Sequence, residues 1–215
     1  MLDFLIIISF HFKLKNFHSH FTLIEYKNYE EYGANIVLPE LYKTYIDDWK
    51  KDVVLEYRID NVELDGVPIK GNIDKIEFEA NTANVIDYKT GKFESSKKKL
   101  NPPNEQDPLG GDYWRQIVFY KLLIENDRRK PYKVLSGELD FVEPDTKKKL
   151  PTKHKIFITP DDELIVKNQI KDSYQRIMNH EFSVGCGKED CSWCNFVRYS
   201  YNQIDIPEQE HEEMN

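Results

Sequence analysis

Two carboxylates and a lysine are the residues of this sequence whose types and spacing best suit catalysis. Asp74 and Asp87 lie on the two arms of a predicted hairpin, and a turn centred between Ala80 and Asn81 would set them directly opposite each other. A turn centred further along would make the pair diagonal, at roughly 7–8 Å, which two ligands of one small ion still tolerate. Lys89 follows Asp87 by two residues, so strand alternation puts both on one face. We therefore expect two carboxylates and an ammonium to converge.

This combination suits the hydrolysis of a phosphodiester. The reaction needs an activated water and neutralisation of the charge that develops on phosphorus, and a hard divalent cation does both. Carboxylates are ligands that Mg²⁺ prefers (Mn²⁺ is the alternative), and the carbonyl of Tyr88 could supply a further oxygen. Lys89 could orient or deprotonate the water, or stabilise the transition state. Alone, an Asp-x-Lys strand is weak support, because alternating charges also occur on solvated sheet faces.

The residues around these three predict a helix and then a three-stranded meander. Turn dipeptides and alternating apolar residues indicate the following elements: a helix between Tyr29 and Trp49, broken or begun near Pro39; strands at Asp52–Asn61, Val67–Glu79 and Ala83–Tyr88; and turns at Asp65-Gly66 and Asn81–Asn84.

The second half of the chain predicts a loop, two helices and two strands. We expect a long polar surface loop at Lys92–Gly111, a helix at Asp112–Asn126 with Asp112 as its cap, strands at Lys133–Val142 and Lys155–Ile158, and a helix at Asp161–His180. The fold class is therefore α/β (α+β), a central mixed β-sheet flanked by helices. We expect an N-terminal extension at residues 1–28, one domain at 29–196 and an acidic tail at 197–215.

Three ordered motifs resemble the nuclease domains of RecB and AddB proteins, which belong to the PD-(D/E)XK superfamily. The motifs are DGVPIKGNIDKI at residues 65–76, VIDYKTGK at 85–92 and QIVFY at 116–120, and the resemblance covers roughly residues 52–196. It implies a restriction-endonuclease-like core, metal binding by Asp74 and Asp87, a catalytic role for Lys89, and a supporting role for Gln116 and Tyr120. The i, i+4 spacing of the last two puts them on one helical face. A core glutamine and a packing tyrosine are the alternative.

The chain also departs from that family. Many relatives carry a metal-binding histidine on an upstream helix, and nothing around His11, His18 or His20 matches it. Ile73 stands where the superfamily has its leading proline. No Gly-x4-Gly-Lys-Ser/Thr motif is present, so this chain has no helicase motor of its own.

Cys186, Cys191 and Cys194 resemble the C-terminal cysteine cluster that holds an iron–sulfur centre in some of these nucleases. Those clusters use four cysteines, one of them upstream of the core, and this chain has three in all. His180 could complete a Cys3His zinc site, although the spacing is loose. Because the ligand set is incomplete, we expect a remnant that binds neither an iron–sulfur cluster nor zinc.

The charge distribution gives mixed signals about nucleic acid. A net charge of -8 argues against it, because phosphates are normally neutralised by surplus lysine and arginine. The segment from Tyr88 to Lys133, however, carries eleven basic and six acidic residues and is therefore basic by +5. Lysines that merely solvate a loop and a helix end are the alternative.

The remaining features concern compartment and partners. Met1–Phe10 is apolar but shorter than the roughly 20 residues that a spanning helix needs, so we expect a buried strand or a start codon placed too far upstream, and no membrane. Three clustered cysteines fit a reducing compartment, which indicates the cytoplasm. We expect a Mg²⁺-dependent deoxyribonuclease acting in DNA repair or recombination, with DNA and a helicase chain or domain as partners. The sequence leaves open whether it is an exonuclease or cuts internally. A degenerate DNA-binding module, or a structural domain serving a helicase, is the alternative.

Overall fold

A five-stranded mixed sheet is the centre of the structure, a computed structural model that describes residues 21–129, 132–181, 185–186, 189 and 191–202. The strands follow sequence order across the sheet, and neighbours are antiparallel except β3 and β4, which are parallel. Their bounds are Val53–Leu64 (β1), Val67–Glu79 (β2), Thr82–Lys89 (β3), Lys133–Phe141 (β4) and Thr152–Phe157 (β5). The predicted α+β class with a mixed sheet is confirmed.

The first three strands form the predicted meander. Asp65 and Gly66 both have positive φ (51° and 84°), the conformation that a tight two-residue hairpin requires, and they join β1 to β2. The second turn lies at Ala80 and Asn81, so the prediction that it extends to Asn84 is wrong. The Thr82 hydroxyl donates to the carbonyl of Glu79 at 2.8 Å, which closes the turn and lets β3 begin at Thr82.

The predicted N-terminal helix begins earlier than expected and is divided. It comprises α2 (Leu23–Tyr32), a π-helical turn (Gly33–Val37), α3 (Leu38–Tyr45) and a 3-10 turn (Ile46–Asp48). The Thr22 side chain and Glu25 form a reciprocal capping box at the start of α2. Pro39 lies in the first turn of α3, where its missing N–H is tolerated, so the irregular turn comes just before it. The apolar segment Met1–Phe10 and the three upstream histidines lie outside the described residues.

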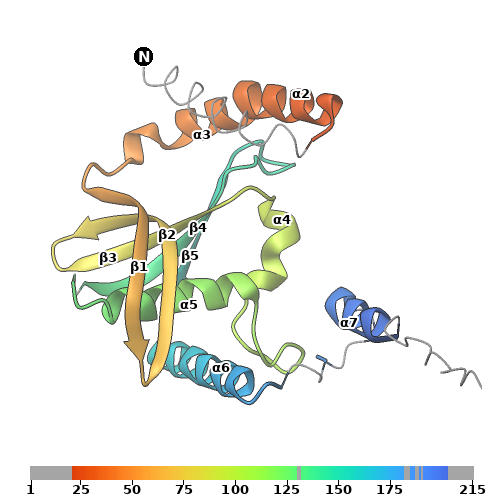
Figure 1. Ribbon diagram of the computed structural model, residues 1–215. Coiled ribbons are helices and arrows are strands. Elements are labelled where there is room, and N and C mark those ends of the chain that lie inside the picture. Colours follow the sequence, from red (N-terminus) through yellow and green to blue (C-terminus); the bar gives the residue numbers. More distant parts are fainter. Residues whose placement is uncertain (1–20, 130–131, 182–184, 187–188, 190, 203–215) are drawn as a thin grey trace, which may run out of the picture. The chain divides into compact units, whose positions relative to one another are not determined.

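Helix α5 (Asp112–Glu125) packs along one side of the sheet (Figure 1). Helix α3 lies on the other side, where the Tyr45 hydroxyl donates to the Pro151 carbonyl at 2.9 Å. The buried face of α5 includes the residues expected from sequence: Trp114, Ile117, Val118, Lys121 and Leu122. The contact with β4 is close, because a Cβ at Gly137 would lie 2.3 Å from Ile117 Cγ2. Asp112 is not the cap: Gly111 holds that position, and Asp112 instead pairs with Arg115 at 3.0 Å.

The predicted surface loop Lys92–Gly111 is wrong in its first half. Residues Phe93–Ser96 form α4, and Lys97–Leu100 form a 3-10 helix whose Leu100 side chain is buried. Phe93 supplies the reason, because its ring packs edge-on against Phe141 of β4 at 5.4 Å. The Gly111 N–H donates to the Asn101 carbonyl at 2.9 Å and so ties this segment to the start of α5.

The chain divides into two compact units, residues 1–170 and 171–215, so α6 (Pro160–Met178) crosses the division. At its start the Thr159 hydroxyl and the Asp162 carboxylate satisfy each other's backbone N–H groups, as a capped helix requires. The second unit also carries α7 (Ser192–Asn202). Across the described ranges, no helix is both long enough and apolar enough to span a membrane.

Candidate active site

Asp74 and Asp87 lie where the ladder between β2 and β3 ends. Of the two registers left open by the sequence, the structure has the one centred between Ala80 and Asn81, with Lys75 paired to Ile86 as the pair nearest to the two aspartates. One step further the two strands separate, and the Asp74 carboxylate accepts the backbone N–H of Tyr88 at 2.9 Å. Because β2 and β3 no longer pair at this point, the Tyr88 N–H of β3 is available to Asp74. The two carboxylates therefore lie at the same end of the hairpin.

Helix α5 holds Asp87 from the side of the sheet. The Gln116 side-chain amide donates to Asp87 Oδ1 at 2.8 Å, and the Tyr120 hydroxyl donates to the same oxygen at 3.0 Å. Gln116 also donates to the Tyr120 hydroxyl at 2.8 Å. Asp87 and Tyr120 are buried, so these bonds act where little water competes for them. The i, i+4 pair predicted from sequence thus forms one connected network around a single carboxylate.

Lys89 completes the network on the strand. Its Nζ lies 2.6 Å from Asp87 Oδ2 and donates to Gln116 Oε1, also at 2.6 Å. The ammonium also lies over the Tyr113 ring, 4.3 Å from the centroid, which is a favourable cation–π distance. Within the described residues Asp87 Oδ2 has no well-aligned hydrogen bond despite the short ion-pair distance. That oxygen is therefore held by charge, and it retains coordination capacity for a cation.

The surroundings of the site raise the pKa values of Tyr120 and Asp74. Burial and the Asp87 charge raise the pKa of Tyr120, so its hydroxyl stays a hydrogen-bond donor at neutral pH. Burial also raises the pKa of Asp74, the Tyr88 N–H opposes that shift, and the Asp87 charge adds to it. A divalent cation between the two aspartates would relieve their repulsion.

Two residues near the site, Glu56 and Tyr113, were missed by sequence reasoning, and Lys99 was counted only as part of the basic segment. Glu56 of β1 is close enough for its charge to raise the pKa of Asp74. Tyr113 carries the ring under Lys89, and the Lys99 ammonium lies 5.0 Å from the centroid of the same ring. Tyr113 follows the helix start by one residue and had no local signal, and nothing local in the expected loop indicated that Lys99 would lie beside it.

Some basic residues of the segment Tyr88–Lys133 form ion pairs within the protein. Lys121 is buried and pairs with Glu125 and Glu163, while Arg129 pairs with Asp127 at 2.9 Å. The side chains of Lys97, Lys98 and Lys99 are exposed on the 3-10 turn that leads towards Tyr113. The basic surface that remains near the site is therefore narrower than the sequence predicted.

A second buried charge group lies on the opposite side of the sheet. Asp140 of β4 is paired in register with Tyr88, and its Oδ1 has no hydrogen-bond partner within the described part of the chain. Burial raises the pKa of Asp140 to about 7, an effect that Lys153 opposes and Glu138 reinforces. Lys153 lies 3.8 Å from Asp140 Oδ2 and 3.4 Å from Glu138 Oε1. These ion pairs with Lys153 give Asp140 and Glu138 a structural role on the side of the sheet that faces α3.

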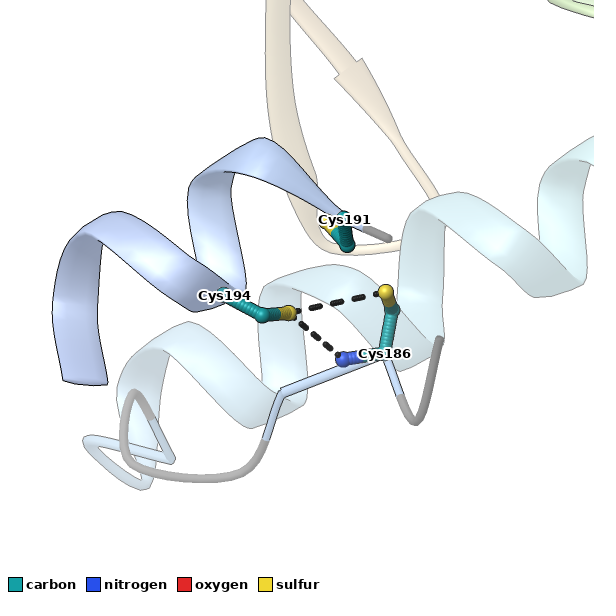
Figure 2. Close-up of side chains that lie close together, drawn as sticks. All are labelled: Cys186, Cys191 and Cys194. Atoms are coloured by element: carbon teal, nitrogen blue, oxygen red, sulfur yellow. Dashed lines mark hydrogen bonds between the residues drawn. The ribbon is translucent and has the colours of Figure 1, made fainter. Parts of the chain in front are cut away.

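The three cysteines of the second unit lie together (Figure 2). Their Sγ atoms all lie within 4.8 Å of one another, and Cys186 and Cys194 are 3.5 Å apart. Backbone N–H groups of α7, which begins directly after Cys191, help to lower the pKa of that thiol to about 7. Among the described side chains of histidine, cysteine, aspartate and glutamate, His180 included, no fourth one joins this group.

Comparison with known protein families identifies the superfamily of this chain, in agreement with its mixed sheet. The sequence pattern of the PD-(D/E)XK nuclease superfamily matches residues 16–199, and the chain belongs to that superfamily. Nucleases of this superfamily generally use divalent metal ions. No curated protein matches the chain closely enough to count.

Two solved structures resemble the chain at low identity. One is the crystal structure of SSO0001, 15% identical, with a TM-score of 0.38 over 91% of this chain and 80% of that one. The other is a provisionally named exonuclease from Eubacterium rectale, 15% identical, with a TM-score of 0.49 over 85% of this chain and 66% of that one.

Proposed function

We propose that this chain is a Mg²⁺-dependent deoxyribonuclease whose reaction centre consists of Asp74, Asp87 and Lys89. Membership in a nuclease superfamily supports hydrolysis of nucleic-acid phosphodiesters. The observation that carries the assignment to these residues is the network around Asp87, in which Gln116, Tyr120 and Lys89 all contact one buried carboxylate. Burying so many polar groups costs desolvation free energy, and the network fixes the orientation of the Asp87 carboxylate.

The donor set fits a hard divalent cation. Asp74 and Asp87 offer carboxylate oxygens, Asp87 Oδ2 lacks a well-aligned hydrogen bond, and the Tyr88 carbonyl belongs to the peptide unit next to the one that Asp74 already binds. Mg²⁺, or Mn²⁺ in its place, binds one or two carboxylates and keeps water and phosphate in its other positions. When bound, the cation would lower the pKa of a coordinated water and polarise the phosphate.

The chain's own residues would supply positioning and charge. Gln116 and Tyr120 fix the Asp87 carboxylate, and the Gln116 carbonyl fixes the Lys89 ammonium, so the two strand residues keep one geometry. Lys89 carries the positive charge that can stabilise the phosphorane-like transition state or hold the attacking water. The Tyr113 ring under Lys89 limits the directions in which the ammonium can move.

DNA is the proposed substrate, and the exposed lysines Lys97–Lys99 are the proposed contacts to its backbone. They follow α4 and end beside Tyr113, so a phosphate near Lys89 would have neighbouring phosphates within reach of them. The RecB-like resemblance supports a role in DNA repair with a helicase chain or domain as partner. We also propose residues 29–196 as the nuclease domain. The three free thiols support a reducing, cytoplasmic setting.

The test compares Asp87→Asn with Asp140→Asn on DNA with Mg²⁺ and with EDTA. Both aspartates are buried to the same degree, 3% and 4% exposed, on neighbouring strands, so Asp140→Asn controls for the replacement of a buried aspartate by asparagine. Cleavage should require Mg²⁺, disappear in Asp87→Asn and persist in Asp140→Asn. Linear and circular DNA used side by side will show whether the enzyme cuts from ends or internally. Equal cleavage by both variants would overturn the assignment.

A catalytically degenerate DNA-binding module is the second candidate. The absence from the sequence of a match to the upstream histidine motif favours it, as does the net charge of -8. DNA binding at low salt without any Mg²⁺-dependent cleavage by the unmutated protein would select this alternative.

A further inference from the structure

The second unit gathers three thiols around one small volume (Figure 2). Cys191 directly precedes α7, Cys194 lies in its first turn, and Cys186 reaches them from the preceding segment. All three Sγ atoms lie within 4.8 Å of one another. Zinc–thiolate bonds of about 2.3 Å in a tetrahedral site place sulfur atoms about 3.8 Å apart, so this spacing suits one ion.

Backbone and side-chain groups around the thiols support them, and one backbone N–H donates a hydrogen bond to a cysteine sulfur. The Cys186 backbone N–H donates to Cys194 Sγ at 3.2 Å, and the Asn195 side chain ties α7 to the Glu189 carbonyl, also at 3.2 Å. A Cβ at Gly185 would lie 2.8 Å from Cys194 Sγ, so a larger residue at this position would displace the sulfur. Backbone hydrogen bonds to thiolate ligands are the usual outer support of a metal site.

The described residues of this unit form no hydrophobic core of their own that would hold the thiols in place. Among its described residues none is buried, and α7 has large apolar side chains that are mostly exposed, such as Trp193 and Phe196. A segment of about 40 residues normally needs a disulfide, a metal or a partner to fold. The cysteines are free, so the clustering of their thiols is not explained by a disulfide.

The residues do not fit the four-cysteine iron–sulfur cluster of related nucleases. Such clusters take one cysteine for each of four positions and spread them over several irons. This chain has three cysteines, and their sulfur atoms lie within 4.8 Å of one another, which is closer than ligands of separate irons need to be. Thiolates in a tetrahedral arrangement favour zinc among the common divalent ions.

We propose that Cys186, Cys191 and Cys194 bind one Zn²⁺ as three thiolate ligands, with water as the fourth ligand, and that this ion folds the segment around α7. This proposal departs from the expectation of a remnant that binds no metal, because the fold places the three Sγ atoms within 4.8 Å of one another. Each thiol loses its proton to solvent on binding, and no oxidant or reductant takes part.

The test measures metal in the full-length chain, purified without oxygen and without chelators from medium supplemented with both zinc and iron. We expect one zinc per chain, with no stoichiometric iron or sulfide. Cys186→Ser, Cys191→Ser and Cys194→Ser should each lose the zinc, while the neighbouring Ser192→Ala should keep it. Exchange of zinc for Co²⁺ should give the thiolate charge-transfer and intense d–d bands of a tetrahedral site.

A folding measurement separates a structural ion from one bound by chance. Removal of zinc by a strong chelator should increase the rate of proteolysis within residues 171–202 by at least tenfold and leave residues 53–157 resistant. Asp87→Asn should retain its zinc, so this result does not depend on nuclease activity. Stoichiometric iron and sulfide, a chain without metal, or Cys191→Ser with full zinc would each overturn the proposal.

Discussion

Removing one hydroxyl group tests whether the network around Asp87 serves catalysis. Tyr120→Phe keeps the ring in the core but deletes the hydrogen bond to Asp87 Oδ1 (3.0 Å) and the acceptor for Gln116 (2.8 Å). Asp87 would still accept from Gln116 and pair with Lys89, so the carboxylate would remain in the site with a less defined orientation.

The magnitude follows from the kind of bond that is lost. A hydrogen bond to a charged group contributes about 1.5–3 kcal/mol, and 1.4 kcal/mol corresponds to a factor of ten in rate. If that free energy is used to orient the metal ligand, Tyr120→Phe should lower kcat/KM about 10- to 100-fold, as outer-shell changes at metal sites commonly do. The Mg²⁺ concentration for half-maximal cleavage should also rise.

Tyr57→Phe is the matched control. Its hydroxyl donates to Asp127 at 3.0 Å, so the variant loses a tyrosine–aspartate bond of the same length away from the reaction centre. The assay is the initial rate of cleavage of end-labelled DNA over a Mg²⁺ titration, with the free energy of unfolding measured in parallel. Equal losses of activity in both variants, or none in Tyr120→Phe, would refute the reasoning.

Three further predictions concern other charges of the structure. Lys89→Ala should retain metal affinity, measured by calorimetry, and lose most of the cleavage rate, because the ammonium acts on the transition state; weaker metal binding would make Lys89 structural. Lys99→Ala should raise KM for DNA several-fold at moderate salt while Lys149→Ala, an exposed lysine in a turn after β4, leaves it unchanged; equal KM values would exclude Lys99 from the DNA interface. Burial raises the pKa of Asp140 from an ordinary value of 3.8 to about 7, so the folded state keeps its proton longer than the unfolded state. The stability of the unmutated protein relative to Asp140→Asn should therefore fall by about 2–4 kcal/mol as the pH rises from 4 to 8; parallel stability curves in denaturant would show that Asp140 titrates normally.

Sequence alone determined which strands pair around the candidate site and limited the second hairpin to two registers. The Asp65-Gly66 turn and the alternating apolar residues fix the first hairpin, and the short turn at Ala80 and Asn81 in the structure selects one of the two registers considered for the second. These are local effects, because turn geometry and a buried face together leave one register without exposed apolar side chains. The helical spacing of Gln116 and Tyr120 likewise predicted their shared face.

Sequence could not locate the partners that come from distant parts of the chain. The first half of the expected loop folds because Phe93 meets Phe141, which lies 48 residues further along the chain, and Lys99 reaches Tyr113 only once that segment is in place. A polar segment has no periodic signal for such contacts, since a single aromatic anchor decides them.

Tertiary structure alone also decided what surrounds the charges. The parallel pairing of β3 with β4 sets Asp140 beside Tyr88, 52 residues apart, and burial there raises the Asp140 pKa. The three thiols could be counted in the sequence, but their convergence depends on where α7 begins and how Cys186 folds back onto it. Residue types and short-range spacing are properties of the chain itself, whereas desolvation and convergence arise only when separate segments pack.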